Sequence, residues 1–347
     1  MTSNAESFGR RRGVLLTGGT GYLGSHAALV LAQAGYTLVL YDNLSNSRLE
    51  VVDRLARILG APPAMVCGDV RDEVALRQTM IEHQVDAVLH FAGLKAVGES
   101  VSDPLSYYDN NVTGTQCLLR AMRAVGVRKL VFSSSATVYG EPRYLPLDEK
   151  HPTGVTNPYG RSKLHIEEML SDLGASDPSW RIACLRYFNP VGAHDSGLIG
   201  ENPNGVPNNL MPYVAQVATG RRARLSVFGA DYPTIDGTGV RDYIHVMDLV
   251  EGHLAALTFL EAHPGWHAFN LGTGHGYSVL EMVRAFEVAS GRRVPYEIVA
   301  RRAGDVAACY ANASKAREQL GWQARRMLDE MCASAWRWQQ TCENLSL

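Results

Sequence analysis

Short apolar segments of strand type alternate with longer helical patterns through the first half of this chain. The apolar segments lie at residues 13–16, 37–41, 64–67, 87–91, 129–132 and 181–187. Between several of them, apolar residues recur at helical spacing, at 25–34 and near 72–84, 104–125 and 158–173. Alternating strands and helices form a parallel sheet that is covered on both faces and joined by right-handed crossovers. The pattern therefore predicts an α/β fold built on a doubly wound parallel sheet.

Glycine, polar and acidic residues gather where these predicted strands end. They lie at 18–24, 42–43, 69–70, 91–93, 133–135 and 189. In a doubly wound sheet, ligands bind in the crevice beyond the carboxyl ends of the strands. We therefore expect these residues to form one site.

The turn after the first strand has the spacing Gly18-x-x-Gly21-x-x-Gly24 and opens the first helix. Bare backbone at such a turn lets a pyrophosphate approach the helix N-terminus. The second strand ends in Asp42, which can accept hydrogen bonds from ribose hydroxyls and would repel a 2′-phosphate. A glycine-rich turn alone is often only a turn. The order strand, glycines, helix, strand and acid predicts a Rossmann-type domain that binds NAD rather than NADP.

The second half of the chain differs in composition. Pro, Gly and Asn are dense between 189 and 208, and helical patterns follow near 209–219, 245–260, 278–290 and 328–341. We expect an NAD-binding domain at 13–190, with 240–270 returning to it. Residues 191–239 and 271–347 are expected to form a smaller α/β substrate domain, and residues 1–12 a flexible extension.

Composition and charge narrow the class of protein. The 347 residues carry a formal net charge of −2, which provides no cationic field for nucleic acid or anionic membranes. No apolar run approaches a membrane span, and the N-terminus lacks a secretory segment, so we expect a cytoplasmic enzyme. The six cysteines form no C-x-x-C pair and fit buried, reduced thiols. His263 and His267 are separated by Pro264 and Gly265, so no metal site is expected.

Tyr159 and Lys163 lie four residues apart at the start of a predicted helix. Asn157 suits the N-cap and Pro158 the first helical position, which places both side chains on one face, one turn apart. A phenol normally titrates near ~10, and a neighbouring ammonium lowers that pKa. The pair can therefore take a proton from a sugar or alcohol hydroxyl. Such pairs are common on helix surfaces, and this one gains weight from the nucleotide-binding pattern that precedes it.

With Ser135, these motifs resemble those of the extended short-chain dehydrogenases/reductases. Longer strings resemble the UDP-glucose 4-epimerases within that family. They are FAGLKAVGES at 91–100, SSSATVYG at 133–140, RYFNPVGAH at 186–194, PNNLMPY at 207–213 and GTGVRDYIHV at 237–246. The similarity extends over nearly the whole chain beyond Arg12.

The resemblance implies a tightly held NAD that is never a net reactant. Tyr159, as phenolate, would remove the proton of the sugar 4-hydroxyl while hydride leaves C4 for the nicotinamide. The resulting 4-keto sugar would turn over within the site and receive the hydride on its other face. Lys163 would lower the Tyr159 pKa and hydrogen-bond the nicotinamide ribose, and Ser135 would hold the reacting oxygen.

The resemblance also implies which other residues line the two ligands. The residues expected along NAD are Gly18, Gly21, Tyr22, Leu23, Gly24, Asp42, Asn43, Asn46, Ser47, Asp69, Val70, Phe91, Ala92, Lys95, Asn110, Ser135, Tyr159, Lys163 and Phe188. Those expected along the UDP-sugar are Lys95, Ser135, Tyr159, Asn189, Asn209, Leu210, Phe228, Arg241, Arg302, Asp305 and Cys309. The two arginines suit a diphosphate, because guanidinium binds phosphate oxygens bidentately.

Cys309 should face the 2-position of the sugar. Members restricted to UDP-glucose and UDP-galactose tend to have a bulky Tyr there, whereas a small residue leaves room for an acetamido group. The sequence therefore predicts turnover of UDP-GlcNAc and UDP-GalNAc as well. The plain alternative is that Cys309 is only a small strand residue and that other walls decide specificity.

Two other functions would be compatible with this scaffold. A nucleotide-sugar 4,6-dehydratase needs carboxylates after Ser135, where this chain has Ala136 and Thr137. A non-catalytic NAD-binding regulator would commonly lose Tyr159 or Lys163.

In the resembling family, the helices near 104–125 and 158–173 pair with their copies in a homodimer. We expect surplus apolar residues there, namely Leu118, Leu119, Met122, Met169 and Leu170.

Overall fold

The computed structural model describes residues 12–203, 205, 207–302 and 304–344, so nearly all of the expected N-terminal extension lies outside it. Its largest element is a parallel seven-stranded sheet with the order β10-β6-β5-β4-β1-β2-β3. The strands are β1 (Gly13–Thr17), β2 (Thr37–Asp42), β3 (Ala64–Cys67), β4 (Val85–His90), β5 (Lys129–Ser135), β6 (Arg181–Tyr187) and β10 (Gly265–Leu271). The strand order reverses between β1 and β4, where a doubly wound sheet opens its ligand crevice. The predicted Rossmann-type sheet is confirmed.

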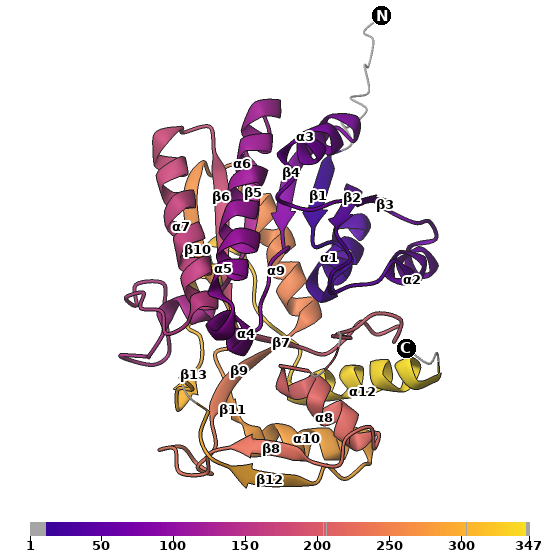
Figure 1. Cartoon of the computed structure of the whole chain (residues 1–347), viewed down its shortest axis with the longest axis vertical. Coiled ribbons are helices and arrows are strands. Elements are labelled where there is room, and N and C mark those ends of the chain that lie inside the picture. Colours follow the sequence, from indigo (N-terminus) through magenta and orange to yellow (C-terminus); the bar gives the residue numbers. More distant parts are fainter. Residues whose placement is uncertain (1–11, 204, 206, 303, 345–347) are drawn as a thin grey trace, which may run out of the picture.

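Helices cover both faces of this sheet, in the upper part of Figure 1. Most belong to the first half of the chain, and they are α1 (Tyr22–Gln33), α2 (Glu50–Leu59), α3 (Glu73–Glu82), α4 (Val97–Ser102), α5 (Pro104–Tyr107), the π-helix η1 (Tyr108–Thr113), α6 (Gly114–Val125), the 3-10 helix η2 (Ala136–Tyr139), α7 (Pro158–Ser176) and α9 (Val246–Phe259). Helices α1 and α9 pack on one face, and α3, α6 and α7 pack on the other.

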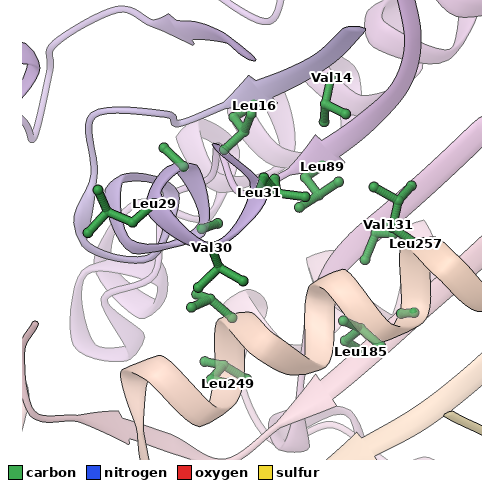
Figure 2. Packing of buried hydrophobic residues seen from close by; sticks show 14 of the residues in the cluster. Val14, Leu16, Leu29, Val30, Leu31, Leu89, Val131, Leu185, Leu249 and Leu257 are labelled. Carbon is green, nitrogen blue, oxygen red and sulfur yellow. The ribbon is translucent and has the colours of Figure 1, made fainter. Parts of the chain in front are cut away.

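Successive strand residues supply the two cores alternately, as the pleat requires. Val14 and Leu16 point toward α1 and α9, whereas Leu15 between them points toward α3 and α6. Figure 2 shows the first of these cores, with Leu257 of α9 next to Val131 of β5 and Leu249 of α9 below Val30 of α1. Because both faces of the sheet are buried, its strands are apolar at nearly every position.

The expectation of surplus apolar residues on α6 and α7 is wrong. Leu118, Leu119, Met122 and Leu170 are all at least nine-tenths buried within one chain, where they pack against the sheet. Met169 is partly buried against the same core. These side chains recur at helical spacing because most of the sheet residues below α6 and α7 are apolar.

Most of the remaining elements form the lower part of Figure 1. They are β7 (Asn189–Val191), α8 (Leu210–Ala218), β8 (Leu225–Phe228), β9 (Val240–His245), β11 (Gly276–Ser278), α10 (Val279–Ser290), β12 (Tyr296–Val299), β13 (Ala308–Cys309) and α12 (Leu328–Asn344). Helix α11 (Ser314–Leu320) instead packs against the core that α1 and α9 share. Strand β9 pairs with β7, β11 and β13, and β8 pairs with β12. Helices α8, α10 and α12 share a third core.

The chain returns to the large sheet through α9 and β10. The return begins at Val246 rather than at 240, because β9 lies in the small sheet. Cys184, Cys332 and Cys342 are buried, whereas Cys67 is exposed and Cys117 and Cys309 are partly buried. Among the residues that the structure describes, no helix is long and apolar enough to cross a bilayer.

Candidate active site

The glycine turn between β1 and α1 is shaped for close approach of a ligand to backbone. Gly18 has a φ of +70°, and a Cβ at Gly24 would lie 2.2 Å from the Gly18 carbonyl oxygen. Gly21 caps α1 without a side-chain hydrogen bond, and the first turn of α1 carries no acidic residue. The positive end of α1 therefore meets an uncapped backbone, which fits the pyrophosphate of a dinucleotide.

Asp42 ties the loop after β2 to this turn. One of its oxygens accepts from the Thr20 backbone N–H at 3.1 Å, and the other accepts from Leu44 N–H and the Ser47 hydroxyl, both at 2.9 Å. The carboxylate is buried and holds the edge where a ribose would lie. Asn46 belongs to the same loop.

Asp69, after β3, lies beside that loop and accepts from Asn43 at 3.1 Å. Arg71 donates to both Asp69 oxygens, at 2.9 and 2.8 Å, and its hydrogen bonds hold the pKa of Asp69 well below the usual range. Sequence analysis missed Arg71. Its two-residue spacing from Asp69 was the available signal.

The loop after β4 carries Phe91, Ala92 and Lys95 across the end of the sheet. The N–H groups of Phe91 and Ala92 both donate to the Thr17 carbonyl at 3.0 Å. Asn111, which is buried, accepts from Leu94 N–H at 2.8 Å and donates to its carbonyl at 3.0 Å. Asn110, the neighbour expected along NAD, donates to the Asn111 side chain at 2.9 Å. The sequence pattern did not identify Asn111 as the residue that holds this loop.

Ser135, Tyr159 and Lys163 meet where β5 ends beside the start of α7. Asn157 caps α7 by accepting from Gly160 N–H at 2.8 Å, and Pro158 occupies the first turn, as predicted. Lys163 is buried, and its Nζ donates to the Ser133 carbonyl at 2.8 Å. Burial lowers the pKa of Lys163 to about 8, although the charge of Glu167 acts in the opposite direction.

Tyr159 has an electrostatic environment that differs from the one predicted. Removal of the phenol from water by burial raises the pKa of Tyr159. A hydrogen bond with Ser135 and the charge of Lys95 oppose that rise. The cation whose charge lowers the pKa of Tyr159 is thus Lys95 rather than Lys163. The physical reason is that the Lys163 ammonium points to the Ser133 carbonyl and lies over the Phe132 ring, 4.8 Å from its centroid.

A second group of predicted residues gathers around β9 and β13. Cys309 is the register partner of Arg241, and the Arg241 guanidinium lies 3.7 Å from the Asp305 carboxylate. Arg302 donates to both Asp305 oxygens, at 3.1 and 2.9 Å, and lies 5.6 Å from the Phe228 ring centroid. Burial raises the pKa of the Cys309 thiol to about 11, so the thiol stays neutral at physiological pH. Two guanidinium groups, an aromatic ring and a carboxylate suit a pyrimidine nucleotide diphosphate.

Glu201 links the two groups of residues. One of its oxygens accepts from Lys95 Nζ at 2.9 Å and from the Asn209 side chain at 2.7 Å. Burial has the largest single effect on the pKa of Lys95 and lowers it, but the charge and hydrogen bond of Glu201 and the charge of Tyr159 together raise that pKa above its ordinary value. Asn209 precedes α8, and Leu210 begins that helix. Sequence analysis missed Glu201, since nothing in the order of residues pairs it with Lys95.

The remaining predicted residues lie at several places around the site. Asn189 begins β7 and is exposed, and Phe188 before it is buried. Tyr22 of α1 reaches across and donates to the Gly192 carbonyl at 2.7 Å. Leu23 of α1 packs against the core, and Val70 after β3 is buried.

The residues after Ser135 bear on the dehydratase alternative. The Thr137 N–H and hydroxyl both donate toward the Ser135 hydroxyl, at 3.2 and 3.0 Å. Ala136 and Thr137 therefore support Ser135 and supply no carboxylate at the positions that 4,6-dehydration requires.

A Rossmann-type sheet with this glycine turn and a Ser-Tyr-Lys group defines an extended short-chain dehydrogenase/reductase. The family model described as GDP-mannose 4,6 dehydratase matches residues 15–335. The chain is 57% identical to UDP-glucose 4-epimerase of Bacillus subtilis over 331 residues, which cover 95% of this chain and 98% of that protein. This chain belongs to the UDP-glucose 4-epimerases, and the predicted enzyme class is confirmed.

Solved structures agree with this assignment. UDP-glucose-4-epimerase from Stenotrophomonas maltophila, with bound NAD and formylated UDP-arabinopyranose, matches with a TM-score of 0.95 and 53% identity, over 96% of this chain and 99% of that one. The UDP-Glc/GlcNAc 4-epimerase of Campylobacter jejuni matches with a TM-score of 0.83 and 37% identity, over 95% of this chain and 100% of that one.

Proposed function

We propose that this chain interconverts UDP-galactose and UDP-glucose with bound NAD, and that it also interconverts UDP-GalNAc and UDP-GlcNAc. The observation that carries the proposal is the convergence of Ser135, Tyr159 and Lys95 at the ends of β4 and β5, beside the glycine turn. Such a site can move a proton and bind a dinucleotide within one crevice.

Tyr159 is the base in this proposal. It takes the proton of the sugar 4-hydroxyl and returns it after the ring has turned over. Ser135 shares a hydrogen bond with Tyr159 and so stabilises the charged oxygen, and Lys95 adds a positive charge nearby. Lys163 is buried as a hydrogen-bonded cation next to Tyr159, one turn along α7.

NAD fits the crevice between the glycine turn and the loops after β2, β3 and β4. Gly18, Gly21 and Gly24 would admit the pyrophosphate, and Asp42 would face the adenosine ribose. When bound, NAD accepts the hydride of C4 and gives it back. The residues of the chain bind, orient and deprotonate the sugar around that step.

The UDP-sugar lies across the second group of residues in this proposal. Arg241 and Arg302 would bind the diphosphate, Asp305 the uridine ribose, and Phe228 the uracil. Cys309 lies on β13 next to Arg241 in the register and presents a small neutral thiol to the same region. A C. jejuni relative of this fold is named for activity on UDP-GlcNAc, which agrees with an acetamido group being accepted here.

The proposed function is tested by product analysis without added NAD. Purified protein is mixed separately with UDP-galactose, UDP-glucose, UDP-GalNAc and UDP-GlcNAc, and the sugar nucleotides are separated by chromatography. We expect each sugar to yield its C4 epimer. A 4-keto-6-deoxy product would indicate a dehydratase, and unchanged sugars would indicate a non-catalytic NAD-binding protein.

We propose that α6 and α7 form a homodimer interface, in which Met169 is the one residue of the predicted set that is only partly buried within one chain. Val112 of η1, and Met169 and Leu173 of α7, pack against the sheet core but are only partly buried within one chain. The rings of Tyr108 of η1 and His165 of α7 stack beside them, with centroids 6.1 Å apart. A two-fold axis would place this surface against its own copy.

Light scattering of the purified protein should give about twice the mass of one chain. Met169→Glu should halve that mass by placing charge in the interface, whereas Met327→Glu, at an exposed methionine outside α6 and α7, should not. A single-chain mass for the unmodified protein at working concentration would contradict the proposal.

Two broader assignments belong to the same proposal. NAD binding is assigned to 13–190 together with the return through α9 and β10, and UDP-sugar binding to 191–245 and 272–347. The enzyme is assigned to the cytoplasm, where its nucleotide substrates and reduced thiols are expected.

A further inference from the structure

Three successive serines at the end of β5 each meet a residue of α7. Ser135 shares a hydrogen bond with Tyr159, and the Ser133 carbonyl accepts from Lys163 Nζ at 2.8 Å. The Ser134 hydroxyl donates to the Glu167 carboxylate. Tyr159, Lys163 and Glu167 are spaced by four residues, so they form one row along the helix. The row thus continues one turn beyond the Tyr-Lys pair.

Glu167 is a buried carboxylate, with 2% of its side chain exposed, and its charge has one close partner. Arg186 of β6 donates to it from Nε at 3.0 and 3.1 Å and from Nη2 at 2.6 Å. Arg186 also donates to the Tyr139 hydroxyl at 3.2 Å, and Tyr139 donates to Asn270 at 2.6 Å. The carboxylate is therefore held from β5, β6 and, through Tyr139, from η2 and β10.

The groups around this row are mostly neutral. The titratable side chains that face it from other elements are His90 of β4, Tyr107 of α5, Tyr139 of η2, and Cys184, Arg186 and Tyr187 of β6. The charge of Lys95, in the loop after β4, also acts on Tyr159, and the charge of Glu149 acts on Tyr139. Burial lowers the pKa of His90 to about 3 and raises those of the tyrosines and Cys184, so these groups carry no charge near neutral pH. Arg186 stays charged. Glu167 is thus the anion next to Lys163 in a region of low polarity.

We propose that Glu167 is a positioning residue for the reaction: it fixes the end of β5 through Ser134 and keeps Lys163 charged and bound to the Ser133 carbonyl. This inference rests on the proposed function, since its consequence is the placement of Ser135 beside Tyr159. Glu167 itself contacts neither substrate nor cofactor in this proposal. A neutral Lys163 would be a weaker donor to the Ser133 carbonyl and would hold the end of β5, two residues before Ser135, less firmly.

The test compares the pH dependence of kcat/KM for UDP-galactose in the holoenzyme and in Glu167→Gln. The amide keeps the shape of the side chain and removes its charge. Since a nearby opposite charge shifts a pKa by about one unit or more, we expect the alkaline limb of the profile to move to lower pH by about one unit. At pH values above that limb, kcat/KM should fall roughly tenfold relative to the unmodified enzyme.

Leu170→Ala is the control for loosening of α7. It removes a buried side chain on the same helix without changing charge. We expect it to lower the melting temperature and to leave the alkaline limb in place. If a folded Glu167→Gln also keeps the limb of the unmodified enzyme, Glu167 is only a structural residue and the inference fails.

Two further measurements guard against ambiguity. Ser134→Ala keeps the charges of Glu167 and Lys163 and removes only the Ser134 hydroxyl that donates to Glu167. It should lower kcat severalfold with little change in KM, and an unchanged kcat would refute the proposal that Glu167 fixes the end of β5 through Ser134.

The melting temperature is a second measurement, and it does not depend on turnover. The pKa of Lys163 in the folded protein should fall further in Glu167→Gln. The loss of stability of Glu167→Gln relative to the unmodified protein should therefore widen as pH falls below about 8. If the unmodified protein does not turn over UDP-galactose, the proposed function fails, whereas this stability measurement still tests Glu167.

Discussion

Tyr159→Phe is expected to lower kcat for UDP-galactose roughly a hundredfold or more, which is the scale of general base catalysis. The substitution removes one oxygen and keeps the ring, so the packing at the start of α7 should survive. That oxygen is the group that shares a hydrogen bond with Ser135 and feels the charge of Lys95. Removing it deletes the proton acceptor and leaves the diphosphate and uracil contacts in place.

The measurement is kcat under saturating UDP-galactose, together with the dissociation constant for UDP. We expect a large loss in kcat and a dissociation constant within a few-fold of the original. Tyr36→Phe is a suitable control, because Tyr36 precedes β2 at the end of the sheet opposite the site. Near-normal turnover by purified Tyr159→Phe would remove the base from the mechanism.

The elements of the large sheet could be predicted because their signals are local. β3 and β6 have the predicted bounds, and Asn157 and Pro158 mark the start of α7. Helix α1 begins at Tyr22, earlier than predicted, because the glycine turn passes directly into it through Gly21. Such patterns depend on a few neighbouring residues, so they can be recognised in the sequence without knowledge of the tertiary contacts.

The sequence did not predict α2, and it placed no strand at β10, β11, β12 or β13, although short strands were expected between the later helices. Strand β13 has two residues and exists because β9 lies beside it, and β10 is a strand because it completes the edge next to β6. Pairing of this kind joins residues that are distant in the chain, and the pattern of apolar residues within each of these strands does not predict it.

In the candidate site too, residues of local motifs could be predicted, whereas residues whose roles depend on distant partners could not. Residues that belong to a motif, such as Gly18, Ser135 and Tyr159, lie where the motif predicts. Glu167, Asn111 and Glu201 were missed because their roles come from partners on other elements. The cation that opposes the rise in the Tyr159 pKa was assigned to Lys163 from helical spacing, although Lys95 acts through the fold.

Cys309→Tyr is expected to suppress turnover of UDP-GalNAc much more than turnover of UDP-galactose. Cys309 lies on β13 beside Arg241 and close to Asp305, among residues proposed to hold the sugar nucleotide. A phenol ring at that position would fill the space that an acetamido group needs. Overpacking a close-packed region costs about 1–3 kcal/mol, so the ratio of kcat/KM for the two sugars should fall roughly five- to hundredfold.

The comparison separates volume from chemistry when Cys309→Ala is measured beside it. Alanine also lacks a ring, so it should keep the ratio of the unmodified enzyme even though the thiol is gone. A ratio that Cys309→Tyr leaves unchanged would show that other walls set the pocket. An unmodified enzyme that turns over UDP-galactose but not UDP-GalNAc would show that the space beside Cys309 is closed from another side. Only loss with tyrosine and retention with alanine assign the acceptance of N-acetylated sugars to the volume at this one strand position.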